Sequence, residues 1–168
     1  EIIHRCACLS GRDFRCWRNK DTVYLMLRDI TQVVQQGSVD METTMEKQRE
    51  NKIRQWVSMW LDNQNTGIED LFAPDAVYIE SWGPEYHGSG KIKLWFDEWN
   101  TRGTVPRWDI RQYFHKGDQT VVEWSFRCAM TDGVIQSFGG LSLIRWNGAG
   151  QIRFLQEFGC NENRYDPY

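Results

Sequence analysis

Glu80 is the residue whose neighbours most suggest chemistry. It lies in VYIESW, residues 77–82, where residue types alternate with the period of two that is typical of a β-strand. Tyr78, Glu80 and Trp82 therefore share one face of the predicted strand. A carboxylate among aromatic rings has its charged form disfavoured, so its pKa rises toward neutral pH, as a general base requires. The structural alternative is an acid that only accepts a hydrogen bond from a neighbouring Tyr or Trp.

Further aromatic residues and one histidine surround this strand in the sequence and are candidates for the wall of a ligand pocket. They are Trp56 and Trp60 before it, His87 in the loop PEYHG, Trp95 in the next predicted helix and Trp108 in the next strand. Each also has an ordinary structural interpretation. The tryptophans suit a hydrophobic core equally well, and the histidine suits an exposed loop.

Metal or cofactor chemistry finds little support in the sequence. His4, Cys6, Cys8 and Cys16 lie close together, but a C-x-C pair without a second C-x-x-C pair is not the usual spacing of a zinc site. The chain contains no GxGxxG, P-loop, HExxH or nucleophile-elbow motif. Its five cysteines form no even framework, which favours reduced thiols in the cytoplasm. We therefore predict no metal site, no cofactor and a cytoplasmic location.

Charge and hydropathy argue against two classes of partner. The net charge of the 168 residues is -3 and the pI is near 5.6, although residues 1–20 carry five Lys and Arg against two acids. An acidic chain with one short basic stretch does not predict nucleic-acid binding. Because no apolar run approaches the roughly 18 residues of a membrane span, we also predict no membrane association.

The first half of the chain has helical periodicity. We predict a helix over residues 22–36 that stops at Gly37, a linker over 38–44, and a strong helix over 42–62. In that strong helix, one broad apolar stripe comprises Ile53, Trp56, Val57, Trp60 and Leu61. A short helix over 68–72 precedes the strand of Glu80, and a helix capped by Ser89 follows it.

The second half of the chain alternates with the period of strands. We predict strands over residues 105–115, 119–130, 134–146 and 151–160, joined by tight turns such as Asp132-Gly133. On the first of these strands, alternation places Trp108, Ile110, Gln112 and Phe114 on one face. The pair Gly139-Gly140 predicts a bulge. Helices followed by consecutive antiparallel strands indicate an α+β fold, and bent strands around helices leave room for a pocket.

Three runs resemble a known family: FAPDAVYIESWGPEYHGSGKIKLWFDEW, VVEWSFRC and GGLSLIRWNGAGQIRFLQEF. They are similar to the SnoaL-like family of the nuclear-transport-factor-two-like superfamily, which also contains ketosteroid isomerases and polyketide cyclases. The resemblance implies a cone-shaped roll, in which N-terminal helices pack on a strongly curved, mostly antiparallel sheet that encloses a pocket. It covers residues 46–160, leaving an N-terminal extension over 1–45, with its helix over 22–36, and a tail over 161–168.

The resemblance also implies roles for particular residues. The general base of ketosteroid isomerases corresponds to Glu80, and the tyrosine and the protonated acid of their oxyanion hole correspond to Trp56 and Ser142. Both oxyanion donors are therefore changed, so steroid isomerisation in the known manner is not implied. The pocket wall on the last strand corresponds to Leu155, Glu157 and Gly159, which makes Glu157 a second catalytic candidate.

Three classes of function fit these features. The first is a cofactor-free isomerase, cyclase or dehydratase acting on an apolar carbonyl or ring compound. The second is a non-catalytic protein that binds an apolar small molecule. The third is a dimerisation or partner-binding module, because members of this superfamily commonly form homodimers through the sheet.

Overall fold

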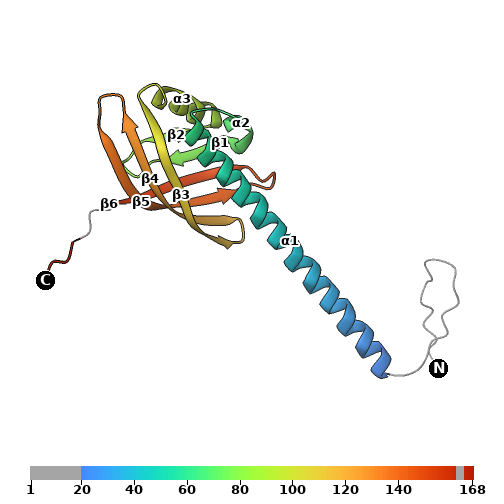
Figure 1. The fold of residues 1–168 in the computed structure, drawn as a ribbon. Coiled ribbons are helices and arrows are strands. Elements are labelled where there is room, and N and C mark those ends of the chain that lie inside the picture. Colours follow the sequence, from blue (N-terminus) through green and yellow to red (C-terminus); the bar gives the residue numbers. More distant parts are fainter. Residues whose placement is uncertain (1–19, 162–164) are drawn as a thin grey trace. The chain divides into compact units, whose positions relative to one another are not determined.

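The structure is a computed structural model that describes residues 20–161 and 165–168 (Figure 1). Its elements in order are α1 (Lys20–Asp62), α2 (Ile68–Leu71), β1 (Phe72–Ile79), β2 (Glu85–His87), α3 (Ser89–Trp99), β3 (Gly103–Lys116), β4 (Gln119–Met130), β5 (Ile135–Trp146) and β6 (Ile152–Asn161). The grouping of His4, Cys6, Cys8 and Cys16 considered above lies outside the described residues. In the part that the structure describes, no helix is long and apolar enough to cross a membrane.

The chain divides into two compact units, residues 1–42 and 43–168, and α1 contributes to both. The predicted stop at Gly37 and the predicted linker over 38–44 are wrong, because α1 continues through them. Gly37 does not adopt the positive φ of a helix-ending glycine. A glycine inside a helix costs only about 1 kcal/mol relative to alanine, and no proline follows to break the helix.

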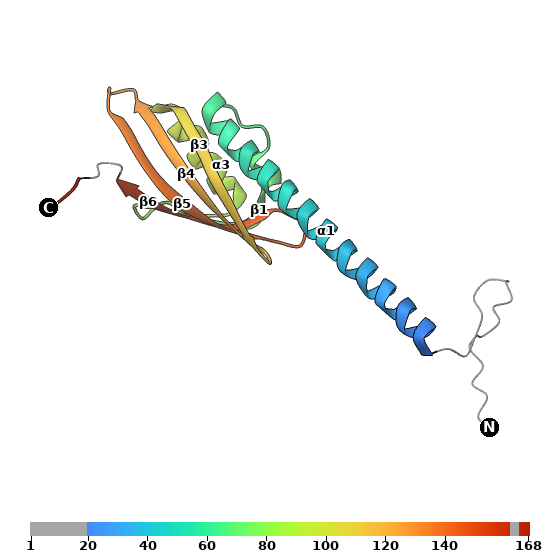
Figure 2. The same cartoon turned by 60° about the horizontal axis from the view of Figure 1, so that its bottom comes forward.

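A six-stranded sheet with the order β2-β1-β6-β5-β4-β3 forms most of the second unit. All its pairings are antiparallel except that of β1 with β6, which joins the first and the last strand of the chain. Figure 2 shows the long strands β3 to β6 curving along their length. The predicted α+β class and curved, mostly antiparallel sheet are confirmed.

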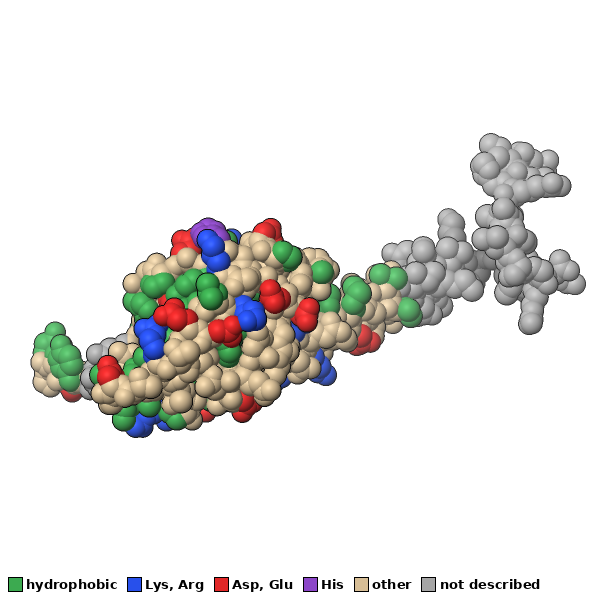
Figure 3. Space-filling view, turned by 90° about the horizontal axis from the view of Figure 1, so that it is seen from above, with side chains coloured by type: hydrophobic (Ala, Val, Ile, Leu, Met, Phe, Trp, Pro, Cys, Tyr) green, Lys and Arg blue, Asp and Glu red, His purple; other side chains and the backbone are tan. Residues whose placement is uncertain are grey.

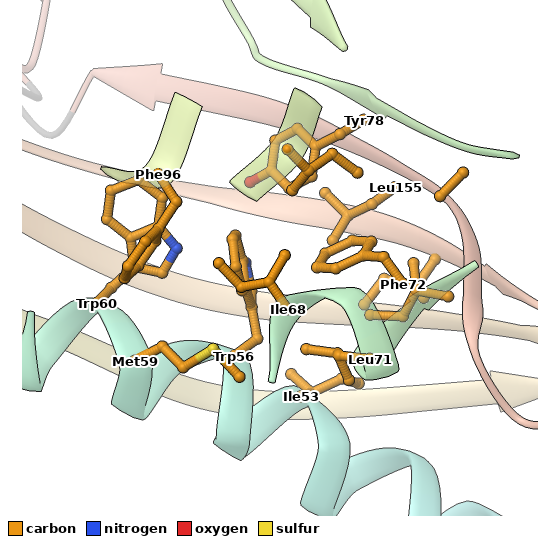
Figure 4. Close-up of a cluster of buried hydrophobic side chains, with 14 of the residues drawn as sticks. Ile53, Trp56, Met59, Trp60, Ile68, Leu71, Phe72, Tyr78, Phe96 and Leu155 are labelled. Atoms are coloured by element: carbon orange, nitrogen blue, oxygen red, sulfur yellow. The ribbon is translucent and has the colours of Figure 1, made fainter. Parts of the chain in front are cut away.

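The core lies where α1, α2 and α3 pack on one face of this sheet. Helix α1 contributes Ile53, Trp56, Met59 and Trp60, and Figure 4 shows them directed toward Phe96 of α3 and toward β1. The ring centroids of Trp56 and Phe72 lie 5.1 Å apart in an edge-to-face arrangement. Such aromatic pairs contribute about 0.5–1.5 kcal/mol beyond their area burial.

Two predictions about strand faces are wrong. The register of β3 shifts between Ile110 and Gln112, so that Tyr113 rather than Gln112 packs against the core, and Phe114 is 52% exposed. No bulge forms at Gly139-Gly140, because β5 pairs in continuous register with β4 and β6 at both glycines. Gly140 instead permits a close approach, since a Cβ there would lie 2.6 Å from Cη2 of Trp124.

Two boundaries near the candidate site also differ from the sequence prediction. Strand β1 begins at Phe72 and ends at Ile79, so Glu80 follows the strand instead of lying at its centre. Ser89 is the first residue of α3 and not its N-cap. The N-cap is Gly88, whose φ of 90° would strain any other residue and where a Cβ would lie 3.0 Å from the carbonyl oxygen of Pro74.

Candidate functional site

The parallel ladder between β1 and β6 brings Glu80 and Glu157 together. Its last two pairs are Tyr78 with Leu155 and Ile79 with Gln156, and the two acids are the next residues, Glu157 within β6 and Glu80 directly after the end of β1. Residues opposite one another in a ladder point to the same face of the sheet. Both side chains are buried on that face, with Glu80 6% and Glu157 9% exposed.

Each carboxylate accepts a hydrogen bond from one tyrosine. The Tyr86 hydroxyl donates to Oε1 of Glu80 over 2.6 Å, and the Tyr78 hydroxyl donates to Oε1 of Glu157. Tyr86 lies on β2, which pairs with β1, so the turn between these strands positions both partners of the first hydrogen bond. A carboxylate has room for further hydrogen bonds, and each acid therefore keeps acceptor capacity for a ligand.

Burial changes the protonation of both acids. Burial, together with the nearby charge of Glu80, raises the pKa of Glu157 to about 7, and the hydrogen bond from Tyr78 only partly opposes this. Burial also raises the pKa of Glu80, again against a hydrogen bond, here from Tyr86. Near neutral pH, Glu157 can therefore either donate or accept a proton, which is the property of a general acid–base group.

The two acids line a cavity of about 470 Å³ whose wall is mainly aromatic. The wall consists of Trp60, Tyr78, Glu80, Trp82, Trp95, Trp99, Trp108, Trp124, Phe126, Cys128, Met130, Gln136, Phe138 and Glu157. Four of these residues, Glu80, Trp82, Trp95 and Trp99, also line a neighbouring surface groove beside α3, so the cavity opens there. This volume lies in the range of pockets that bury a small organic molecule.

Comparison with known proteins identifies the family. A model of the SnoaL-like domain matches residues 53–154. The chain belongs to the SnoaL-like domain family. The matched residues include β1, α3 and most of the sheet. Among curated proteins, no significant match to the chain was found.

Solved structures show that this SnoaL-like domain has the ketosteroid isomerase-like fold. One neighbour is a hypothetical protein with that fold from Catenulispora acidiphila, in complex with trimethylamine, with 19% identity, a TM-score of 0.55, and coverage of 64% of this chain and 83% of that chain. Another is an LEH-like epoxide hydrolase from M. tuberculosis, with 10% identity, a TM-score of 0.61, and coverage of 68% and 84%. A steroid delta-isomerase from Pseudomonas aeruginosa has 17% identity, a TM-score of 0.53, and coverage of 68% and 81%.

The SnoaL-like domain places seven of the eleven predicted site residues in the cavity wall. They are Trp60, Tyr78, Glu80, Trp82, Trp95, Trp108 and Glu157. Trp82 lies at the opening and is 60% exposed, with its ring packed edge-to-face on Phe138.

The other four predicted site residues do not line this cavity. Trp56 and Leu155 are buried in the core behind the wall. Ser142 accepts a hydrogen bond from Nε1 of Trp124 over 2.9 Å, and it therefore positions a wall residue. His87 is exposed on β2, with its Nε2 atom 3.0 Å from Oε1 of Glu85.

Sequence reasoning missed the six wall residues that β4 and β5 supply. Trp124, Phe126 and Cys128 alternate along β4, but nothing in that alternation identifies their face as the cavity side. Trp99, Met130, Gln136 and Phe138 were also missed. One wall residue has a free donor: Nε1 of Trp60 is buried and has no hydrogen-bond partner among the described residues.

Proposed function

We propose that this SnoaL-like protein binds a small, largely apolar molecule in its tryptophan-lined cavity and moves a proton on it without a cofactor. The observation that carries this proposal is the pair of buried carboxylates at the end of the β1–β6 ladder, inside an otherwise aromatic wall. The favoured reaction class is isomerisation, cyclisation or dehydration of a carbonyl compound. All three begin with removal of a proton from carbon.

The two acids suit different roles in such a reaction. Glu80, in its ionised form, removes a proton from the carbon next to the carbonyl group. The electron pair of the broken C–H bond moves to the carbonyl oxygen, to which neutral Glu157 donates a hydrogen bond. A general base of this kind typically accelerates the reaction by about 10²–10⁴-fold.

The test is a mass-spectrometric survey of small molecules that co-purify with the protein, followed by turnover assays on the molecules recovered. We expect Glu80→Gln to lose turnover while still binding the recovered molecules, at most several-fold more weakly, because the amide keeps the shape of the side chain but cannot accept the proton. Glu85→Gln is the matched control, since Glu85 lies on the neighbouring strand and faces solvent. Turnover by Glu80→Gln at the wild-type rate would refute the assignment of the base.

A non-catalytic binding protein is the second candidate function. Its support is that both carboxylates already accept a tyrosine hydroxyl, as purely structural acids do. The same survey separates the two functions. A binding protein would release every recovered molecule chemically unchanged, and Glu80→Gln would then have no catalytic effect to measure.

We also propose that the protein forms a homodimer through the face of the sheet that the helices leave open. Phe114, Leu141 and Phe158 are exposed large hydrophobic residues on β3, β5 and β6, and Leu141 lies directly opposite Phe158 in the ladder. Figure 3 shows, by contrast, that charges of both signs are interspersed over another view of the surface. Analytical ultracentrifugation should find a dimer that Leu141→Glu converts to a monomer, and a monomeric wild type would refute this proposal.

The free thiols of Cys128 and Cys160 support our further proposal that the protein works in the reducing cytoplasm.

A further inference from the structure

The charges around the cavity do not balance. Its wall contains the carboxylates of Glu80 and Glu157, but no described Lys, Arg or His side chain lines it. Lys91 and Arg102 line the adjoining groove, and Arg102 is already paired with Glu98 over 3.3 Å. Buried carboxylates are normally compensated by a cation or by protonation. The cavity therefore has a place for a positive charge that the wall itself does not supply.

A bound metal ion is a poor candidate for that charge. Among the described residues, nowhere do three or more His, Cys, Asp or Glu side chains gather as a metal site would require. The remaining polar groups of the wall include the Tyr78 hydroxyl, the Gln136 amide and the Cys128 thiol. Of these, only the thiol is a side chain that a transition metal prefers, and among the described residues it belongs to no group of three such ligands.

The tryptophan rings of the cavity wall lie at large angles to one another. The ring centroids of Trp60 lie 5.1 Å from those of both Trp95 and Trp99, with interplanar angles of 58° and 76°. Across the cavity wall, Trp108 and Trp124 lie 6.2 Å apart at 72°. Indole faces attract cations more strongly than other aromatic rings, and rings set at angles to one another are how proteins hold ammonium groups.

We infer that the ligand of this cavity carries a substituted ammonium group, which sits among the tryptophan rings and compensates one of the two negative charges that Glu80 and Glu157 carry when both are ionised. A quaternary or tertiary ammonium suits the wall better than a primary amine, because its methyl groups pack on aromatic rings and need few hydrogen-bond acceptors. The cavity volume of about 470 Å³ is larger than such a group requires, which leaves space for the apolar body of the molecule.

This inference rests on the proposed function, since it assumes that the cavity binds a small molecule, and it names the class of that molecule. The charge would also assist the proposed chemistry. A cationic nitrogen near the reacting carbon stabilises the negative charge that develops when the proton leaves. An aliphatic ketone of the same shape would lack both this stabilisation and the compensation of the two carboxylates.

The experiment compares two probes of nearly equal shape on the full chain. Choline carries a trimethylammonium group, and 3,3-dimethylbutan-1-ol carries an uncharged tert-butyl group in the same place. Calorimetric titration near pH 8, together with quenching of tryptophan fluorescence, should show choline binding about tenfold more tightly than its neutral isostere. Glu80→Gln and Glu157→Gln should each weaken choline binding several-fold and leave binding of the isostere unchanged, whereas Glu85→Gln should change neither.

The possible outcomes separate this inference from the proposed function. Equal or tighter binding of the neutral isostere would overturn the inference and leave an apolar ligand, with Glu80 as base, intact. Choline binding that is lost equally in Glu85→Gln would also overturn it, because attraction to general negative charge would then explain the affinity. Failure of choline to bind overturns the ammonium assignment, and the co-purification survey then decides separately whether the cavity holds a molecule at all.

Discussion

Replacing Glu157 by Gln should change how the stability of the protein depends on pH. Burial and the charge of Glu80 raise the pKa of this acid from 4.5 to about 7 in the folded chain. Between these two pH values the folded state binds one more proton than the unfolded state, so the free energy of unfolding falls as the pH rises. The contribution is fully present below about pH 4.5 and is lost as the pH passes through about 7.

The size of the effect follows from the same two values. At about 1.4 kcal/mol for each pH unit, the interval from 4.5 to about 7 corresponds to about 3 kcal/mol. Glutamine remains neutral at every pH and can still accept the hydrogen bond from Tyr78. The variant and the wild type should therefore have similar stability near pH 4, and the variant should be about 3 kcal/mol more stable near pH 8.

Urea denaturation followed by far-ultraviolet circular dichroism, repeated from about pH 4 to pH 8, measures this difference directly. Subtracting the wild-type curve from the variant curve cancels groups that titrate alike in both proteins. Glu85→Gln is the control and should follow the wild type, because its side chain is exposed. A stability difference that stays constant over the whole range, or that moves against the variant as the pH rises, would refute the claim that Glu157 is buried without a counter-charge.

Two further predictions concern packing in and behind the cavity wall and are tested by chemical denaturation. Gly140→Ala should lower the free energy of unfolding by about 1–3 kcal/mol, because the new Cβ would lie 2.6 Å from Cη2 of Trp124. Gly148→Ala is the control and should be nearly neutral, since nothing lies within 4 Å of a Cβ there. Equal effects of the two substitutions would contradict this packing. Trp56→Ala should cost about 3–5 kcal/mol because this side chain is only 3% exposed. Trp82→Ala should cost less than about 1 kcal/mol because the ring is 60% exposed, and a reversed order would place Trp82 in the core.

Local periodicity was sufficient where an element depends mainly on its own residues. The prediction for Gln119–Met130 matches β4 at both ends, because strict alternation and the flanking turns are local signals. The prediction failed where pairing with a neighbouring strand determines the face on which a residue lies. The shift between Ile110 and Gln112 depends on how β3 pairs with β4, and a change of one residue exchanges the faces of everything beyond it.

The candidate site could be predicted only in part for a related reason. Alternation and family resemblance placed Glu80 and Glu157 on inward faces, since this requires only the period of a strand. Whether an inward residue meets the cavity or the core depends on the depth at which helices pack. Trp56 and Leu155 lie beneath the wall for this reason, whereas Trp60, one turn along α1 from Trp56, reaches the cavity. That depth is a tertiary property, and no single segment encodes it.

The parallel ladder between β1 and β6 has a consequence for biosynthesis. Glu157 is added to the growing chain 79 residues after its partner Tyr78, and the strand that carries it is the last element of the sheet. A ribosome therefore exposes most of the tryptophan wall well before the acid pair can assemble. Because β6 pairs with both β1 and β5, a product that terminates before residue 157 cannot join the two parts of the sheet, so the cavity and its acid pair form only after translation reaches the final strand.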